Sequence, residues 1–212
     1  MKDFPIFTTE YGVASLVLKE IPYKEEAYIT IRSSDTPAEL LKECMSFCRM
    51  CGAERVYAKG DPSLEAYPLH TLTLEMELDV HAQDAPAALI PVTAKTVGQW
   101  RTICNERMHS VDNAATLERK DEKWILESGG AYFIYNKEEL LGIGWIDKGE
   151  LMAVAAVKPG AGQQIMETLF NLMDGQVLRL QVASTNTKAI RLYERLGFRQ
   201  TKEVSRWYRV FP

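Results

Sequence analysis

The chain has 212 residues, of which 46% are hydrophobic and 25% charged, and its formal net charge is −4. This ordinary globular mixture excludes a disordered or low-complexity chain, and the acidic balance argues against a nucleic-acid partner. No run of about 18 apolar residues is present, so a membrane-spanning helix is not expected. The first residues hold no apolar signal core, so we expect a cytoplasmic protein with no membrane partner.

The first 80 residues contain both strand-like and helix-like patterns. Asp35-Thr36-Pro37 is typical of a helix start, because a capping residue precedes a proline of the first turn. Apolar and polar side chains alternate strictly from Leu72 to Leu78, which predicts a half-buried strand. The patterns together predict strands over 11–21, 25–33, 54–58 and 70–78, a helix over 37–51 and a short helix over 64–67.

The segment 81–96 has the composition of a connector, with Pro86, Pro91 and several small residues. We place a boundary near residue 86, which gives an N-terminal unit of residues 1–85 and a larger domain of residues 86–212. The ALIPV sequence within this segment alternatively forms the first strand of the larger domain.

The larger domain begins with helical patterns and continues with strands. Short turns at Asn136-Lys137 and Lys148-Gly149 indicate hairpins between three successive strands. A mixed sheet with helices on it, an α/β (α+β) fold, is therefore expected. Its predicted elements are helices over 97–109 and 113–127, strands over 131–135, 139–147 and 150–157, a helix over 161–174, a strand over 177–182, a helix over 186–196, and strand character at Phe198 and over 204–211.

Three of the four cysteines, Cys44, Cys48 and Cys51, recur at helical spacing and would share one helix face. A metal site is one interpretation, but no fourth ligand is evident nearby. We expect these residues to pack in the core, since free cysteine behaves as a small buried hydrophobe.

The sequence NTKAIRLYERLGF, residues 186–198, carries the most specific pattern. It resembles the N-x-x-A-x-x-[LF]-Y-x-x-x-G-F signature of the GNAT superfamily of N-acetyltransferases. Six residues stand where the signature requires them: Asn186, Ala189, Leu192, Tyr193, Gly197 and Phe198. An amphipathic helix with a C-terminal glycine explains the apolar residues, but not Asn186 and Tyr193 in the same frame.

The resemblance implies a GNAT-like acyl-CoA N-acyltransferase fold and acetyl-CoA as cosubstrate. The pantetheine arm would lie in a wedge between two splayed strands, 150–157 and 177–182. The following loop and helix N-terminus would hold the pyrophosphate, since free N–H groups converge there. Asn186 and Tyr193 would also contact the cofactor. The residues implied at the loop are Val157, Lys158, Pro159, Gly160, Ala161, Gly162 and Gln163.

The loop departs from the family pattern V-x-P-x-x-[RQ]-G-x-G-x-[GA] and is one residue shorter. Ala161 replaces the Arg or Gln, Gly162 keeps the first glycine, and Gln164 and Met166 replace later small residues. The backbone donors survive these changes, and Lys158 supplies one positive charge.

Acetyl transfer to an amine requires a neutral amine, a polarised thioester carbonyl and a stabilised leaving thiolate. The resemblance assigns the general acid to Tyr193, and the carbonyl-polarising N–H to the wedge strand near Ala155. Glu150 is the candidate base, with an ordered water or His109 as alternatives. The acceptor site would lie between helices 97–127 and the strands, where most of the aromatic side chains are expected in the core. Its candidate lining residues are Trp100, Glu106, Trp124, Tyr132 and Trp145.

Residues 24–80 repeat the strand–helix–strand order of the larger domain without its signatures. They are interpreted as a truncated GNAT-like unit, with an unrelated α/β domain as the alternative. The chain is therefore expected to acetylate a primary amine of a small molecule or peptide. A catalytically silent acyl-CoA-binding or regulatory module, and an interaction protein that forms a homodimer, are the rival interpretations.

Overall fold

The computed structural model describes residues 5–81 and 87–211, which form two compact units. The first unit contains the chain up to Thr73 together with the residues from Glu203 onwards, and the second contains Leu74–Lys202. Strands β5 (Leu69–Asp79) and β11 (Arg199–Phe211) contribute residues to both units. The predicted boundary near residue 86 lies outside the described residues, and the division into 1–85 and 86–212 stays a prediction.

The first unit is a sheet in the order β1-β2-β3-β4-β11-β5. Strands β3 and β4 are parallel and are connected by helix α2, while β2 pairs antiparallel with β3. Its elements are β1 (Ile6–Thr9), β2 (Gly12–Val17), α1 (Ile21–Lys24), β3 (Glu26–Ser33), α2 (Pro37–Met50), β4 (Arg55–Lys59) and the 3₁₀ helix η1 (Pro62–Ala66).

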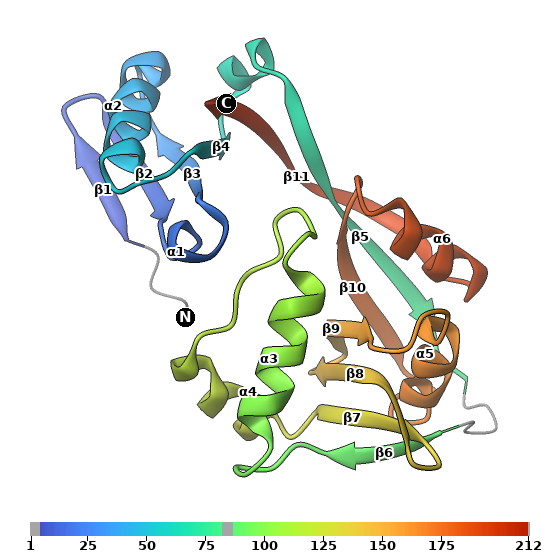
Figure 1. The fold of residues 1–212 in the computed structure, drawn as a ribbon. Helices are drawn as coiled ribbons and strands as arrows, with labels where there is room; N and C mark the ends of the chain where they lie inside the picture. Colours follow the sequence, from blue (N-terminus) through green and yellow to red (C-terminus); the bar gives the residue numbers. More distant parts are fainter. Residues whose placement is uncertain (1–4, 82–86, 212) are drawn as a thin grey trace. The chain divides into compact units, whose positions relative to one another are not determined.

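Helix α2 buries one apolar stripe against the sheet (Figure 1). Leu40, Leu41, Cys44 and Cys48 are at most 2% exposed and share a core with alternate residues of β3 and β4. The predicted helix over 37–51 is confirmed, and so is core packing for Cys44 and Cys48. Cys51 is exposed, because the helix ends at Met50 and the cysteine follows it.

The second unit is a sheet in the order β11-β5-β10-β9-β8-β7-β6. Strand β10 runs parallel to β9, whereas β6, β7, β8 and β9 form an antiparallel meander. No helix in the described part of the chain is long and apolar enough to cross a bilayer. The elements are β6 (Ala88–Pro91), α3 (Val97–Met108), η2 (Arg119–Asp121), α4 (Glu122–Ser128), β7 (Ala131–Asn136), β8 (Glu139–Asp147), β9 (Glu150–Ala156), α5 (Gly162–Phe170), β10 (Val177–Ala183) and α6 (Thr187–Arg195).

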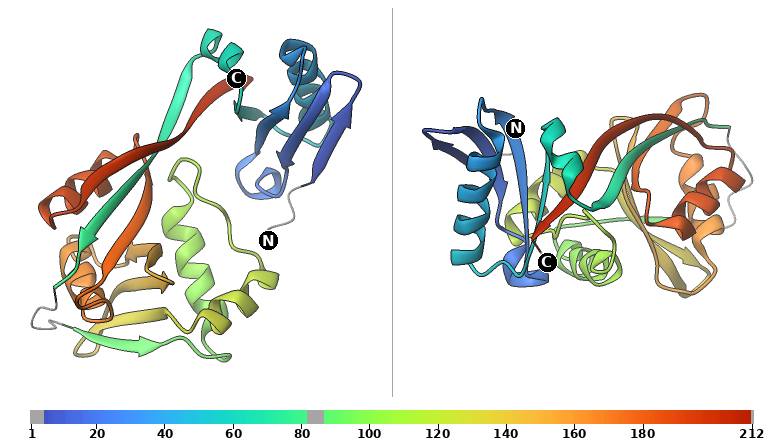
Figure 2. Two further views of the ribbon diagram at one scale, coloured as in Figure 1. Left: turned by 180° about the vertical axis from the view of Figure 1, so that it is seen from behind. Right: turned by 90° about the horizontal axis from the view of Figure 1, so that it is seen from above.

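Helices cover both faces of this sheet (Figures 1 and 2). On one face, Trp100 and Ile125 of α3 and α4 share a core with Ile143 and Trp145 of β8. On the other face, α5 packs against β8, which has glycine at the alternate positions. A Cβ built on Gly142 would lie 2.6 Å from Ile165 Cδ1, and one on Gly144 would lie 2.6 Å from Leu169 Cδ1. The two glycines therefore let α5 approach the strand closely.

Several predicted boundaries are wrong for identifiable reasons. The helix expected over 113–127 begins only at η2, because the Glu118 N–H donates to Asp121 Oδ2 in a capping box. The helix expected over 161–174 ends at Phe170. The strand expected over 11–21 ends at Val17, and Pro22 lies in the first turn of α1. Phe198, expected to have strand character, lies just before β11, and the strand expected over 204–211 begins earlier, at Arg199.

We expect Gly142→Ala to destabilise the fold, because the new Cβ would lie 2.2 Å from the Ala155 carbonyl oxygen. Overpacking of this kind costs roughly 1–3 kcal/mol. The measurement is the free energy of unfolding from urea denaturation. Gly98→Ala in α3 is the control, because the atom nearest to its new Cβ is 3.8 Å away. Equal effects of the two substitutions would contradict the close approach of β8 to its neighbours.

Candidate functional site

Strands β9 and β10 separate soon after they meet. Their parallel pairing joins Arg179 with Glu150 and Leu180 with Leu151, at the start of β9. Beyond Leu151, no register pair connects the described residues of the two strands, although β9 continues to Ala156 and β10 to Ala183. The wedge between 150–157 and 177–182 that the sequence implied is therefore present as a parting of the two strands. It leaves the β10 side of β9 as an edge with backbone groups available for pairing.

A β-bulge coincides with the point of separation. Across the hairpin, Trp145 pairs with Ala153 and Ile146 pairs with Leu151, so Met152 is the extra residue on β9. A bulge bends its strand and increases its twist. This gives the physical reason why β9 turns away from β10 immediately after Leu151. Strand β9 contains no glycine or proline from which the sequence would predict the bulge.

The segment after β9 leads into the N-terminus of α5. Gly160 has φ of +84°, a conformation that favours glycine, and Ala161 occupies the N-cap position. No side chain caps this helix. Within the described part of the chain, no acceptor is found for the N–H groups of Gly160, Gly162 and Gln163. These donors and the positive end of the helix dipole suit an anion.

Two cations lie at this loop, but one of them is already paired. Lys158 Nζ is 2.5 Å from Glu139 Oε2, so its charge is compensated by a carboxylate of β8. Arg107, at the end of α3, donates a long hydrogen bond of 3.4 Å from Nη2 to the carbonyl oxygen of Val157. Sequence analysis did not identify Arg107, since it precedes the loop by 50 residues. It brings to the loop a second positive charge, from a residue outside the loop's own sequence.

Four of the six signature residues, namely Asn186, Ala189, Leu192 and Tyr193, are the N-cap of α6 or lie within this helix. Asn186 is the N-cap, and its Oδ1 accepts a 3.2 Å hydrogen bond from the Ala189 N–H. Leu192 adjoins the N-terminus of α5, because a Cβ on Gly162 would lie 3.0 Å from its Cδ2. The signature helix and the N-terminus of α5 are therefore neighbours.

Tyr193 is 7% exposed and packs against Phe198, with ring centroids 5.6 Å apart. Burial raises the pKa of Tyr193 to about 12. A tyrosine at its ordinary pKa is already protonated at neutral pH, and burial extends the protonated range of Tyr193 to higher pH. The side chain can then donate a hydrogen bond but does not ionise near pH 10, as an exposed tyrosine would.

The other candidate residues lie at two places on β9 and at the end of α3. Glu150 is exposed at the hairpin, at the end of β9 that pairs with β10. Ala155 is 7% exposed and lies beyond the bulge, in the part of β9 that has left β10. His109 is exposed just after α3. Ala155 alone of these three is in the wedge.

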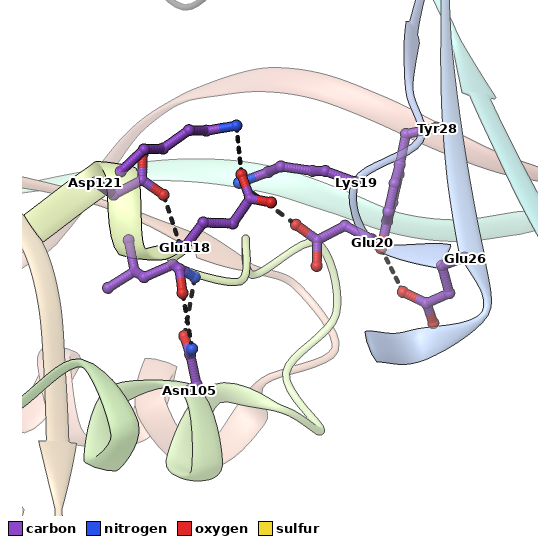
Figure 3. A network of polar contacts seen from close by, with 9 residues as sticks. Lys19, Glu20, Glu26, Tyr28, Asn105, Glu118 and Asp121 are labelled. Atoms are coloured by element: carbon purple, nitrogen blue, oxygen red, sulfur yellow. Dashed lines mark hydrogen bonds and ion pairs between the residues drawn. The ribbon is translucent and has the colours of Figure 1, made fainter. Parts of the chain in front are cut away.

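The loop between α3 and η2 is fixed at both ends. Asn105 Nδ2 donates to the Leu117 carbonyl and its Oδ1 accepts from the Leu117 N–H, both at 2.9 Å (Figure 3). Thr185, just before α6, donates a 2.6 Å hydrogen bond to Asp112 Oδ2. The loop is thereby attached to the connection between β10 and α6.

The aromatic residues near this loop are mainly structural. Trp100 is fully buried and donates from Nε1 to the Tyr132 carbonyl, while Trp145 is 2% exposed and donates to Ser128 Oγ. The expectation that most of these aromatics belong to the core is confirmed for these two.

The Asn113 side chain is unusual, because both of its polar atoms are buried without a hydrogen-bond partner among the described residues. Such unpaired groups are rare in proteins.

We expect Asn186→Ala to lower the free energy of unfolding by roughly 0.5–2 kcal/mol, because the first turn of α6 loses its cap. Asn186→Ser should retain most of the stability, since serine caps a helix about as well as asparagine. Chemical denaturation of both variants tests this. If the serine variant is as unstable as the alanine variant, Asn186 is not acting as a cap.

No known family model matches this sequence, and no curated protein matches it either. Solved structures do match. A provisionally assigned acetyltransferase from Pyrococcus horikoshii is similar at 13% identity and a TM-score of 0.60, over 95% of this chain and 70% of that one. A conserved protein of unknown function from Staphylococcus epidermidis is 10% identical with a TM-score of 0.60, over 99% and 94% of the two chains.

A GCN5-related N-acetyltransferase from Anabaena variabilis is 11% identical with a TM-score of 0.57, and the match covers 93% of this chain and 58% of that one. At such identities the likeness is one of fold. The splayed strands, the helix after β9 and these neighbours together show that the chain has the mixed α/β fold of the GNAT acyl-CoA N-acyltransferases.

Proposed function

We propose that the protein is an N-acetyltransferase that moves an acetyl group from acetyl-CoA to a primary amine of a small molecule or peptide in the cytoplasm. The observation that carries this proposal is the parting of β9 from β10 beside the uncapped N-terminus of α5. The neighbouring helix α6 supplies a buried tyrosine. The division into a truncated GNAT-like unit of residues 1–85 and a catalytic domain of residues 86–212 is part of the proposal.

The geometry fits the parts of acetyl-CoA one by one. The freed edge of β9 beyond Leu151 suits the amide groups of a pantetheine arm, which pair as an added strand would. The N–H groups of Gly160, Gly162 and Gln163 suit the pyrophosphate, and Ala161 and Val157 complete that loop. Arg107 adds positive charge next to Val157.

In the transfer step, the amine nitrogen attacks the thioester carbonyl carbon, so that a C–N bond forms and the C–S bond breaks. The surplus amine proton leaves to a base, for which we propose Glu150 or a water molecule. The departing sulfur needs a donor, and the Tyr193 hydroxyl is protonated at neutral pH and above, since burial raises its pKa to about 12 from an already high value. A hydrogen bond from its hydroxyl would therefore stabilise the thiolate. The N–H groups of β9 near Ala155 would polarise the carbonyl.

The rival function is a catalytically silent acyl-CoA-binding or regulatory module. The ion pair between Lys158 and Glu139 favours it, because a compensated lysine contributes less to phosphate binding. Binding of acetyl-CoA without release of thiol, across a panel of amines, would support this rival over catalysis.

Calorimetric titration with acetyl-CoA tests the cofactor site. We expect saturable binding, weakened about tenfold in Gln163→Glu because the new carboxylate at the start of α5 repels the pyrophosphate. Acetyl-pantetheine, which has no pyrophosphate, should bind both proteins equally. No binding by the unmodified protein, or an equal loss for both ligands, would contradict this placement of the cofactor.

Tyr193→Phe should lower kcat by about ten- to thousandfold, as expected when a proton or hydrogen-bond donor to the leaving group is lost. Binding of acetyl-CoA should change little, because the ring and its contact with Phe198 are retained. The measurement is thiol release under saturating amine. Tyr135→Phe on β7 is the matched control. An unchanged kcat in the Tyr193 variant would remove the residue from the mechanism.

A further inference from the structure

The sheet of the first unit has two chemically different faces. Ala27, Ile29 and Ile31 of β3 are buried in the core under α2. The alternate residues Tyr28 and Thr30 point to the opposite face. Arg32 is the extra residue of a β-bulge against β2, and its hydrogen bond to Ser15, the register partner of Thr30, places its side chain on that face as well. The same alternation places Tyr57 and Lys59 of β4 on that face, since Val56 and Ala58 belong to the core.

Strand pairing brings two cations and a tryptophan together at the carboxyl ends of β3 and β4. Thr30 is the register partner of Lys59 in the parallel pair, so Arg32 lies two residues further along the neighbouring strand. Tyr208 of β11 pairs with Ala58 of β4. This register places Trp207, also of β11, beside Lys59 of β4. The Lys59 Nζ lies 4.5 Å from the centroid of the Trp207 ring.

The two cations lack a carboxylate partner. Within the described residues, no acidic side chain is in ion-pairing distance of Arg32 or Lys59. Asp61, the acid closest to Lys59 in sequence, accepts hydrogen bonds from the N–H and hydroxyl of Ser63. Glu26 accepts from the Tyr28 hydroxyl at 2.7 Å and pairs with Arg55, at the opposite end of these strands (Figure 3).

Both cations are held in place by neutral groups. The Arg32 Nε donates a 3.0 Å hydrogen bond to Ser15 Oγ, which fixes the guanidinium and leaves its terminal nitrogens for a ligand. The Trp207 ring in turn is packed edge-on against Tyr28, with centroids 5.4 Å apart. Lys59 is half-buried, and burial together with the nearby Arg32 lowers its pKa. A bound anion would remove this repulsion between like charges.

We infer that Arg32 and Lys59, supported by Ser15 and Trp207, form a site for an oxyanion, namely the carboxylate or phosphate group of a small molecule, on the face of the first unit opposite α2. The guanidinium fork and the ammonium group would each donate to the same group. This site belongs to the first unit and does not depend on the proposed acetyl transfer.

Titration with inorganic phosphate and, separately, with acetate tests the site, with sodium chloride at matched ionic strength as the blank. Trp207 fluorescence is the readout, and Trp207→Phe identifies its signal among the four tryptophans. We expect a saturable change with at least one of the two anions. Response to phosphate alone indicates a phosphate ester as ligand, whereas response to acetate indicates an organic acid; both results support the site.

Lys59→Met and Arg32→Gln should each weaken binding about tenfold or more, because each removes a charge-assisted hydrogen bond. Arg49→Gln is the matched control, since Arg49 also lies 4.5 Å from an aromatic centroid, that of Phe211, but in a different part of the unit. Binding in Arg49→Gln should be unchanged. The inference is overturned if neither anion gives a saturable change, or if all three variants respond alike.

Discussion

The extra residue in β9 is the constraint on which the candidate site depends. Met152 has no partner of its own across the hairpin, and the strand leaves β10 directly after Leu151. Without the bulge, parallel pairing would continue along β9 and satisfy the backbone groups that now face the wedge. A strand edge inside a sheet is costly unless something covers it. In the proposed function, the amide groups of a pantetheine arm would cover this edge, so that a local irregularity of pairing would decide where the ligand binds.

The wall of the wedge is held by close packing rather than by polar contacts. Gly142 and Gly144 allow α5 to lie against β8, and this fixes the helix N-terminus at the end of β9. Gly162 then lies against Leu192, which brings α6 and its tyrosine next to the same helix end. The small residues at these three positions therefore determine where the loop after β9 and the helix that carries Tyr193 lie relative to the sheet. Such packing leaves little room to adjust, because protein interiors are nearly as dense as organic crystals.

The two units differ in how their positively charged side chains are paired. In the second unit, Lys158 is compensated by Glu139, so the proposed pyrophosphate site would depend on backbone N–H groups and on Arg107. In the first unit, the partners of Arg32 and Lys59 among the described residues are the neutral side chains of Ser15 and Trp207. A net charge of −4 gives no indication of either arrangement, since it averages over the whole surface.

The sequence by itself determined the features that depend on neighbours within a turn or a strand. The alternation in β5, the proline at the start of α2, the cap at Asn186 and the glycine after α6 all rest on local rules, and the GNAT-type fold followed from the last two with Tyr193. Tertiary structure alone decided the bulge at Met152, the approach of Arg107 to Val157 and the pairing of Lys158. Each of these depends on strand register or on contacts between residues far apart in the chain. Local propensity carries no information about such contacts, because their energy arises only when the sheet has formed.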